Sequence, residues 1–442
     1  MKPVVVIGGG LAGPEAAYQL ARQNVPVELW EMRPRVSTPA HQTSGLGELV
    51  CSNSLKSEAP NSAPWLLKEE LRRGDSLLLA CAAAAAVPGG QALTVDRVQF
   101  SGAIESALTS LPQVRIRREE ATALPPEPGA LTIIASGPLT SAPLAAALAA
   151  LAGRQHLYFY DAIAPVVEAD SLVYEAMYAA SRWGKGGDDF WNCPLDRSQY
   201  ERFRQAILDA ESYPLHAFEE THYFEACLPL EELARRGPET LRFGPMKPVG
   251  LPDPRTGRPP YAAVQLRREN LRADSFNLVG FQNHLRFGAQ AEILRLIPGL
   301  ERARFLRFGQ VHRNSYLAAP AVLNERLQFQ RHVHVWAAGQ LCGTEGYIEA
   351  MATGWLAGRF AAAVAQERAL APPPRTTATG SLLHYITQAR AESYVPANMT
   401  FDLLPALVEP VRERSQRHER QCTRALADFE AWLQPQGELT HA

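Results

Sequence analysis

The residues with the clearest chemical meaning form a turn near the N-terminus, made of Gly8, Gly9, Gly10, Leu11, Ala12 and Gly13. The turn has the spacing Gly-x-Gly-x-x-Gly, follows an apolar run and opens a helix-like segment. In this context the glycines allow a tight turn, let the backbone approach a pyrophosphate, and let helix and strand pack closely. The helix N-terminus then faces the negative charge. The turn therefore predicts a bound adenine dinucleotide.

Two further positions describe this dinucleotide. Glu31 ends the second predicted strand, 18 residues after Gly13, where a carboxylate accepts hydrogen bonds from an adenosine ribose and disfavours a 2′-phosphate. A late apolar strand at residues 334–338 ends at Gly339 and Gln340, in the form that flavoproteins use beside the ribityl-pyrophosphate, although an acid is usual where Gln340 stands. The chain has no second Gly-x-Gly-x-x-Gly and no Cys-x-x-Cys. We therefore predict resident FAD and disfavour a disulfide reductase.

The cysteines are the candidate nucleophiles: Cys51, Cys81, Cys193, Cys227, Cys342 and Cys422. None lies in a zinc-ligand spacing, so we expect no metal site. Taken alone, each is more often a small buried apolar residue than a reactive thiol. Cys51 stands in a polar loop in which Lys56 is available to favour a thiolate.

The elements that must position these residues indicate an α/β fold, with a Rossmann-like FAD-binding domain of the glutathione-reductase type. Its strand-like segments are residues 4–7, 25–31, 131–134 and 334–339. The stretch before the last segment is of domain length and richer in arginine and aromatics, which predicts an inserted α+β domain. The predicted limits are 1–165 and 305–370 for the two parts of the FAD-binding domain, 166–304 for the inserted substrate domain, and 371–442 for a C-terminal helical extension.

Size and composition allow this organisation. The chain has 442 residues, 46% hydrophobic and 20% charged, with a net charge of −2. This content fills large cores and excludes wholesale disorder. The longest apolar run, residues 77–87, is far shorter than the roughly 20 residues of a membrane span, and no signal peptide fits the N-terminus. We therefore expect a soluble, cytoplasmic protein without a membrane partner.

Local charge differs from the whole-chain charge. Residues 235–313 contain fourteen arginines and one lysine against six acidic residues, an excess of nine positive charges on a chain of net −2. A basic region on an otherwise acidic chain is typical of contact with a phosphate backbone. The alternative is that these arginines form ion pairs with the acidic remainder.

Eight blocks of sequence follow one another in an order that is shared with a known family. The blocks are residues 48–54, 159–162, 192–195, 224–229, 241–251, 280–285, 309–314 and 343–347. Together they resemble the folate- and FAD-dependent tRNA (uracil-5-)-methyltransferases. The likeness covers nearly the whole chain, and the block at residues 241–251 is highly specific. A more distant similarity is to the GidA-type flavoproteins that modify wobble uridine in tRNA, which share the FAD domain but not the 241–251 block.

The resemblance implies a reaction. The family takes a methylene group from 5,10-methylenetetrahydrofolate, reduces it with flavin electrons supplied by NADH or NADPH, and forms 5-methyluridine at position 54 in the T-loop of tRNA. Uracil C5 is a poor nucleophile, so the site needs a thiolate that adds at C6 and a base that removes the C5 proton. The resemblance makes Cys227 the nucleophile and Cys51 the base, and implies no obligate protein partner.

The remaining site residues divide between cofactor and substrate. For FAD we expect the six residues of the glycine turn with Glu31, Arg33, Gly339, Gln340 and Tyr347. For the substrate we expect Arg242, Lys247, His284, Arg286, His312 and Arg313. Candidates for stacking on an exposed base are Phe243, Phe287 and Tyr316.

Two other functions stay open at this point. One is a GidA-type enzyme that modifies wobble uridine with a partner protein. The other is a flavin-bearing tRNA-binding factor whose redox chemistry is incidental. The position of the modified nucleotide separates the first from a T-loop methyltransferase, and dependence on methylenetetrahydrofolate separates the second.

Overall fold

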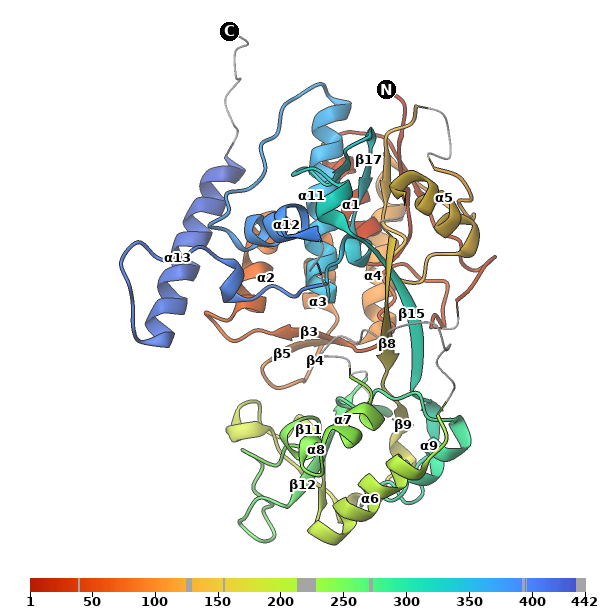
Figure 1. The fold of residues 1–442 in the computed structure, drawn as a ribbon, viewed down its shortest axis with the longest axis vertical. Coiled ribbons are helices and arrows are strands. Elements are labelled where there is room, and N and C mark those ends of the chain that lie inside the picture. The colour runs from red at the N-terminus through yellow and green to blue at the C-terminus, as the bar shows by residue number, and fades with distance from the viewer. Residues whose placement is uncertain are drawn as a thin grey trace.

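The fold has two parts joined by a two-stranded ladder (Figure 1). The structure is a computed structural model. It describes residues 1–38, 40–124, 129–153, 156–212, 228–269, 273–391, 394 and 396–434, and for residues 156–163 and 310–315 it describes the backbone alone. The N-terminal strands and the C-terminal helices lie in one part, and the middle of the chain forms the other.

The first part is built on a six-stranded sheet with β1 near its centre. The strand order is β16 (Gln328–Phe329), β17 (His332–Ala337), β7 (Thr132–Ile134), β1 (Val4–Ile7), β2 (Val27–Trp30) and β6 (Val114–Arg117). All neighbours are parallel except β16 and β17. β1 is buried throughout, as its unbroken apolar sequence requires of a parallel strand covered on both faces. The chain leaves β1 toward β2 and later returns on its other side at β7, so the carboxyl end of β1 is a topological switch point.

Helices and a small second sheet surround this core. The helices are α1 (Ala12–Arg22), α2 (Ala63–Arg73), α3 (Leu77–Ala84), α4 (Arg97–Thr109), α5 (Ala142–Ala152), α10 (Ala319–Val322) and α11 (Tyr347–Ala365). The small sheet is β3 (Ser54–Ser57), β5 (Ala92–Val95) and β4 (Ala86–Val87), antiparallel throughout. The Asp96 carboxylate caps α4 by accepting from the amides of Val98 and Gln99 at 3.0 and 3.1 Å, which fixes where the helix begins.

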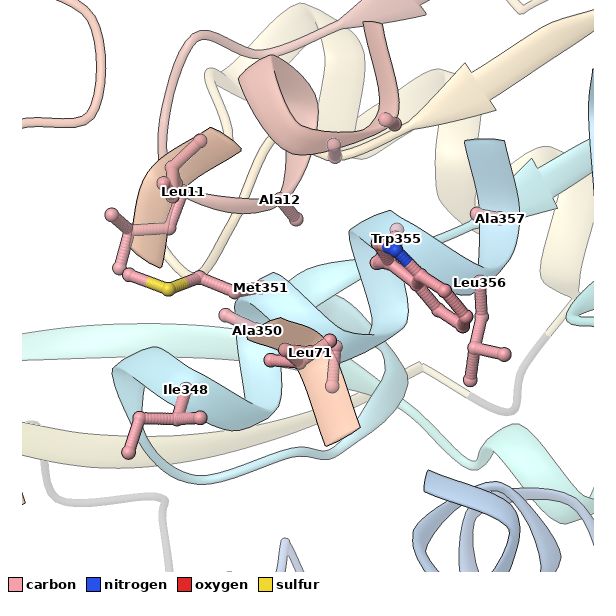
Figure 2. Packing of buried hydrophobic residues seen from close by; sticks show 14 of the residues in the cluster. Leu11, Ala12, Leu71, Ile348, Ala350, Met351, Trp355, Leu356 and Ala357 are labelled. Atoms are coloured by element: carbon pink, nitrogen blue, oxygen red, sulfur yellow. The ribbon is translucent and has the colours of Figure 1, made fainter. Parts of the chain in front are cut away.

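Helices α1 and α11 pack unusually closely (Figure 2). A Cβ at Gly354 would lie 2.2 Å from the backbone oxygen of Ala12, and one at Gly358 would lie 2.6 Å from that of Ala16. Met351 and Leu11 seal the same contact near the start of both helices. The two glycines therefore set how near α11 lies to the glycine turn at the start of α1.

The inserted part is an antiparallel sheet with helices. Its strand order is β10 (Tyr178–Ala179), β11 (Phe190–Leu195), β12 (Ala262–Arg268), β13 (Ser275–Leu278), β9 (Val166–Glu168) and β14 (Phe305–Arg307). Its helices are α6 (Arg197–Asp209), α7 (Leu230–Arg236), α8 (Thr240–Phe243) and α9 (Phe287–Leu294). It has its own core, separate from that of the first part. β8 (His156–Ile163) and β15 (Gln310–Leu317) pair antiparallel and run between the two parts (Figure 1).

The C-terminal segment joins the first core. Helices α12 (Ala378–Gln388) and α13 (Arg414–Leu433) pack against α2. The ring of Trp355 in α11 lies 5.7 Å from Phe429 and 5.8 Å from Trp432 of α13, between ring centroids. The buried carboxylate of Glu70 in α2 accepts from the first amides of α12, at 2.6 and 2.8 Å. This segment is thus part of the hydrophobic core that supports α11.

The predicted fold class is confirmed: a Rossmann-type parallel sheet carries an inserted α+β domain. The predicted domain limits stay predictions; the second sheet takes its strands from residues 166–307. Among the described residues, no helix has both the length and the apolar character needed to cross a bilayer.

The close approach of α1 and α11 predicts the effect of one methyl group. Gly354→Ala places a Cβ against the Ala12 carbonyl, so we expect a loss of about 2 kcal/mol in the free energy of unfolding. The matched control is Gly102→Ala in α4, where a Cβ meets nothing within 4 Å and helix propensity should improve. Urea unfolding measures both variants, and equal stability in the two would contradict the packing described here.

Candidate cofactor cavity and active site

The glycine turn is shaped by close backbone contacts on two sides and is open on the third. Gly8 has a φ of +114°, and a Cβ there would lie 2.3 Å from the backbone oxygen of Ala135. A Cβ at Gly13 would lie 1.8 Å from the Gly8 oxygen. A Cβ at Gly10 would meet nothing within 4 Å. Gly8 and Gly13 are therefore required by the fold, whereas Gly10 leaves room for something that binds.

That room is part of a cavity at the carboxyl end of the parallel strands, where ligands bind in folds of this kind. Three elements meet there: the β1–α1 turn, residues 135–141 after β7, and Gly339 with Gln340 after β17. The predicted cofactor residues on its wall are Gly8, Gly9, Gly10, Leu11, Ala12, Glu31, Arg33, Gly339, Gln340 and Tyr347. Gly13 does not line the cavity. It lies against the carbonyl group of Gly8, where α1 follows β1.

The cavity fits a dinucleotide such as FAD. No side chain caps the N-terminus of α1, so its first amides remain available to a pyrophosphate. The bare Cα of Gly10 gives a phosphate close access to those amides. The approach from β7 and β17 is lined by small residues and short turns, which leave space along the carboxyl edge of the sheet.

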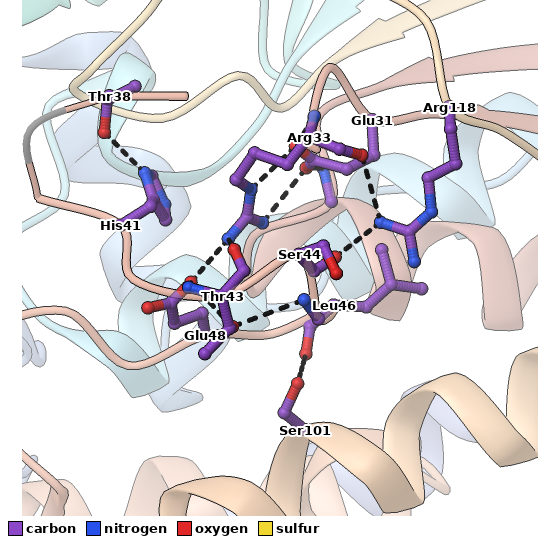
Figure 3. Close-up of polar contacts among 12 residues, drawn as sticks. Glu31, Arg33, Thr38, His41, Thr43, Ser44, Leu46, Glu48, Ser101 and Arg118 are labelled. Carbon is purple, nitrogen blue, oxygen red and sulfur yellow. Dashed lines mark hydrogen bonds and ion pairs between the residues drawn. The ribbon is translucent and has the colours of Figure 1, made fainter. Parts of the chain in front are cut away.

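A buried ion network joins the cavity wall to the next loop (Figure 3). The side chain of Arg33 is 2% exposed, and it bonds Glu31 through Nε at 2.8 Å and Glu48 through Nη1 at 2.6 Å. Glu31 also accepts from the Gly9 amide at 2.8 Å. Burial alone would raise the pKa of Glu31, but the hydrogen bonds and charge of Arg33 outweigh it and the pKa is lowered. Glu31 therefore stays ionised at the edge of the turn.

Glu48 connects this ion network to the loop that contains Cys51. Its carboxylate accepts from the amides of Gln42 and Thr43 at 2.8 and 3.2 Å. Figure 3 shows Arg33 reaching across this loop to Glu48, with Thr43 beside it. The chain then passes through buried Leu49 to Cys51. The cofactor turn and the cysteine loop are thus held by one arginine.

Tyr347, the first residue of α11, brings Cys51 to the cavity. Its hydroxyl oxygen accepts from the amides of Cys51 and Ser52 at 2.9 and 3.1 Å and lies 2.9 Å from the Cys51 sulfur. Burial, followed by the nearby Cys51, raises the pKa of Tyr347 well above its ordinary value, so the phenol stays protonated. Because Tyr347 also lines the cavity, the Cys51 thiol contacts a residue of the cavity wall.

Three arginines also bond the same loop. Arg97 bonds the Leu49 carbonyl, and Arg307 bonds that of Val50 at 2.9 Å. Arg267 bonds the Ser52 hydroxyl at 2.6 Å and the Asn53 side-chain oxygen at 3.0 Å. We did not predict a role for these residues. Arg267 and Arg307 were visible only as members of the basic region, and nothing in the sequence marked Arg97.

Lys56, which we expected to favour a thiolate at Cys51, has its partners elsewhere. Its ammonium group bonds Glu349 at 2.8 Å and also bonds Asn398. The positive charges that bond the loop around Cys51 are arginines, and two of them, Arg267 and Arg307, come from the inserted domain.

Cys51 differs from the other cysteines that the structure describes. Cys81, Cys193, Cys342 and Cys422 are buried, whereas Cys51 is partly exposed. Burial raises the pKa of Cys81 to about 11 and that of Cys422 to about 12, and it also raises the pKa values of Cys193 and Cys342. These four are packing thiols. The predicted nucleophile Cys227 lies outside the described residues.

The predicted substrate residues occupy different environments. His284 is buried and paired with Glu231. Arg242 bonds the Tyr261 carbonyl at 2.7 Å, pairs with Glu239, and lies over the Tyr261 ring. Lys247 is exposed. Arg286 pairs with Glu211 at 3.1 Å. His312 and Arg313 lie in β15, where the side chains are outside the described residues, so all six stay predictions.

The basic region is partly neutralised by ion pairs within the inserted domain. The paired arginines include Arg235, Arg242, Arg255, Arg286 and Arg304. Among the aromatic candidates, Phe243 is 77% exposed and Phe287 stacks on Phe308, whereas Tyr316 is buried. In the described part of the chain, no three His, Cys, Asp or Glu side chains gather as metal ligands do.

Comparison with known proteins first defines the class. A sequence model of the family described as "Glucose inhibited division protein A" matches residues 3–369. Two solved structures of GidA from Aquifex aeolicus have TM-scores of 0.70 and 0.68 and cover 97% of this chain, and 76% and 73% of their own chains, at 15% and 16% identity. Those structures show the fold alone. The chain is thus a Rossmann-type protein of the GidA class.

Relatives of higher identity define the family more narrowly. A protein from Koribacter versatilis is 55% identical over 432 residues, 97% of each chain. One from Solibacter usitatus is 56% identical over 440 residues, 98% of each chain. Both are named "Methylenetetrahydrofolate--tRNA-(uracil-5-)-methyltransferase TrmFO". The chain belongs to this TrmFO family, which confirms the resemblance seen in its sequence.

The open side of the glycine turn gives a prediction that separates binding from folding. Gly10→Ala adds a methyl group in the space left for a pyrophosphate, so FAD affinity should fall at least about tenfold. The cofactor-free protein should keep its unfolding free energy within about 0.5 kcal/mol. Gly13→Ala should lower both the FAD affinity and the free energy of unfolding, because its Cβ would meet the Gly8 oxygen. Flavin absorbance per chain and urea unfolding report the two effects, and unchanged flavin content in Gly10→Ala would refute this assignment.

Proposed function

We propose that this protein methylates C5 of a uridine in the T-loop of tRNA, at position 54, with the methylene carbon of 5,10-methylenetetrahydrofolate. The carbon bonds to C5 in place of the C5 proton, and a hydride from reduced FAD completes the methyl group. Tetrahydrofolate and oxidised FAD are the other products, and NADH or NADPH reduces the flavin again. Membership of the TrmFO family supports this proposal.

The observation that carries it is the place of Cys51. A thiol held by Tyr347 lies behind the wall of a cavity that fits FAD. C5 methylation needs a base and a one-carbon unit next to a hydride source. A packing cysteine has no need of a phenol that bonds its sulfur and also accepts from its own amide and from the amide of Ser52. The geometry thus supports a reacting Cys51 close to the flavin.

The cavity residues divide the cofactor between them. The amides at the start of α1 and the open Cα of Gly10 would take the pyrophosphate. Glu31, kept ionised by Arg33, would accept from the adenosine ribose. Gly339 and Gln340 would contact the ribityl-pyrophosphate, and Tyr347 the ring system. When bound and reduced, FAD supplies the hydride.

Two thiols then have complementary roles. The Cys227 thiolate adds to C6 of the uracil and makes C5 nucleophilic. After C5 has taken the carbon, Cys51 removes the C5 proton, and Cys227 leaves as the C5–C6 double bond forms again. The hydroxyl of Tyr347 orients the Cys51 sulfur for that proton.

The inserted domain is the proposed tRNA contact. Lys247, Phe243 and Arg286 are exposed on it and offer charge and a stacking surface. His284 is a poorer candidate for direct contact with RNA, because its side chain is buried and already paired with Glu231. A substrate of this kind suits a cytoplasmic enzyme, as the sequence led us to expect.

A GidA-type reaction at the wobble uridine is the second candidate, because the GidA structures share the fold over 97% of this chain. The TrmFO relatives at 55% and 56% identity favour the T-loop reaction. A tRNA-binding factor with an incidental flavin would have no use for the Tyr347–Cys51 arrangement.

The carbon source tests the proposal. With FAD, NADPH and a tRNA transcript, methylenetetrahydrofolate labelled in its methylene carbon should transfer label to RNA, and labelled S-adenosylmethionine should not. Cys227→Ala should abolish transfer yet keep the flavin, while Cys422→Ala, a buried thiol in α13, should transfer normally. Scintillation counting of purified RNA measures the label. Label from S-adenosylmethionine, or full transfer by Cys227→Ala, would overturn the proposed chemistry.

A further inference from the structure

Three arginine side chains form hydrogen bonds with the loop from Leu49 to Asn53. One comes from the first part of the fold and two come from the inserted domain. Arg97 begins α4 in the first part, whereas Arg267 in β12 and Arg307 in β14 belong to the inserted domain. Each bonds a different group of the loop, as described above. Cys51 is also one of the groups that influence the pKa of each of these arginines, so all three lie near it.

This cluster has more positive than negative charge. Glu269, just after β12, pairs with Arg97 at 2.5 Å, and its other oxygen accepts from Arg97 at 3.3 Å. Among the described residues, no carboxylate oxygen lies within 4.0 Å of the guanidinium nitrogens of Arg267 or Arg307. The Nε and Nη2 atoms of Arg307 are buried and have no hydrogen-bond partner in the described part of the chain. Within the described part of the chain, the three arginines therefore share one carboxylate, that of Glu269.

Burial makes that excess costly. It lowers the pKa of Arg267 to about 10 and also lowers the pKa of Arg307, in each case by disfavouring the charged form. Buried charges are normally paired, because an unpaired one loses its hydration without compensation. A second negative charge within the cluster would relieve both arginines.

The hydrogen bonds of Tyr347 indicate where that charge lies. A phenol has two acceptor positions and one hydrogen to donate. The amides of Cys51 and Ser52 fill the two acceptor positions. The hydroxyl hydrogen is then left for the Cys51 sulfur at 2.9 Å, which makes the sulfur the acceptor. A thiolate accepts such a bond more strongly than a thiol.

We propose that Arg307, Arg267 and Arg97 are positioning residues that keep Cys51 as a thiolate when the inserted domain lies against the FAD-binding domain. Among the residues that the structure describes, the groups near the sulfur include these arginines, the carboxylate of Glu269 and the hydroxyl of Tyr347. The role of this thiolate as the base for the C5 proton rests on the proposed function, but its ionisation does not. The inserted domain therefore sets the charge of a residue in the other part of the molecule.

The pH dependence of Cys51 alkylation tests the thiolate directly. The FAD-loaded protein is treated with iodoacetamide across a pH series without RNA, and peptide mass analysis follows Cys51 alone. An unperturbed cysteine reacts with a midpoint near about pH 8.5, whereas a cation within a few ångströms lowers the midpoint by about one unit or more. We expect a midpoint below about pH 7.5. A midpoint at the ordinary value contradicts the proposal.

Variants of Arg307 test the cause. Arg307→Met should raise the midpoint by about one unit and slow alkylation at pH 7 about tenfold, and Arg307→Lys should restore most of the rate. The matched control is Arg182→Met, another partly buried arginine of the inserted domain, which bonds Gln265 and the Val249 carbonyl and should leave the profile unchanged. Flavin absorbance shows that each protein is folded, and Arg307→Gln replaces Arg307→Met if the latter is not.

The results separate this proposal from the proposed function. An unchanged midpoint in Arg307→Met or Arg307→Gln, or an equal change in Arg182→Met, overturns the role of the cluster whatever the methylation assay gives. A shifted midpoint supports the cluster even if the RNA substrate proves to be a different one, because the measurement contains no RNA.

Discussion

Arg33, buried between Glu31 and Glu48, is the interaction on which the site depends. Glu31 closes the glycine turn through the Gly9 amide, and Glu48 begins the loop that leads to Cys51. Loss of one partner of such a buried pair leaves an uncompensated charge, which costs about 3–5 kcal/mol. The same arginine therefore aligns the cofactor cavity and the loop that carries Cys51, the proposed base.

The rest of the structure keeps those two places together. Gly354 and Gly358 allow α11 to approach α1, and Tyr347 at the start of α11 then reaches Cys51. The C-terminal helices pack behind α11 through Trp355. The inserted domain supplies Arg267 and Arg307, which bond the same loop. Groups from both domains thus contact the loop of Cys51, and the hydroxyl of Tyr347 contacts its sulfur.

The cofactor half of the site was predictable because it is local in sequence. The spacing of Gly8, Gly10 and Gly13 carries its geometry within one strand, turn and helix, and the return at Gly339 has the same local character. The parallel sheet and the inserted domain followed from these segments and their order.

The catalytic half was less predictable because it depends on tertiary contacts. Arg97 and Arg267 are 170 residues apart in the chain and resemble any other arginines until the fold brings them to one loop. Lys56 is near Cys51 in sequence, but its ammonium group turns to Glu349. Ion pairs such as that of Arg242 with Glu239 also leave less free positive charge for RNA than a count of arginines suggests. Sequence proximity and net charge therefore predict the members of such a site poorly, because the direction of each side chain determines what it contacts.

The position of the new methyl group tests the central claim most directly. A tRNA transcript is incubated with the enzyme, FAD, NADPH and methylenetetrahydrofolate, digested with nucleases, and its fragments are mapped by mass spectrometry. The account predicts a single 5-methyluridine, in the T-loop at position 54. A modified wobble uridine in the anticodon, or an unmodified T-loop, would contradict it.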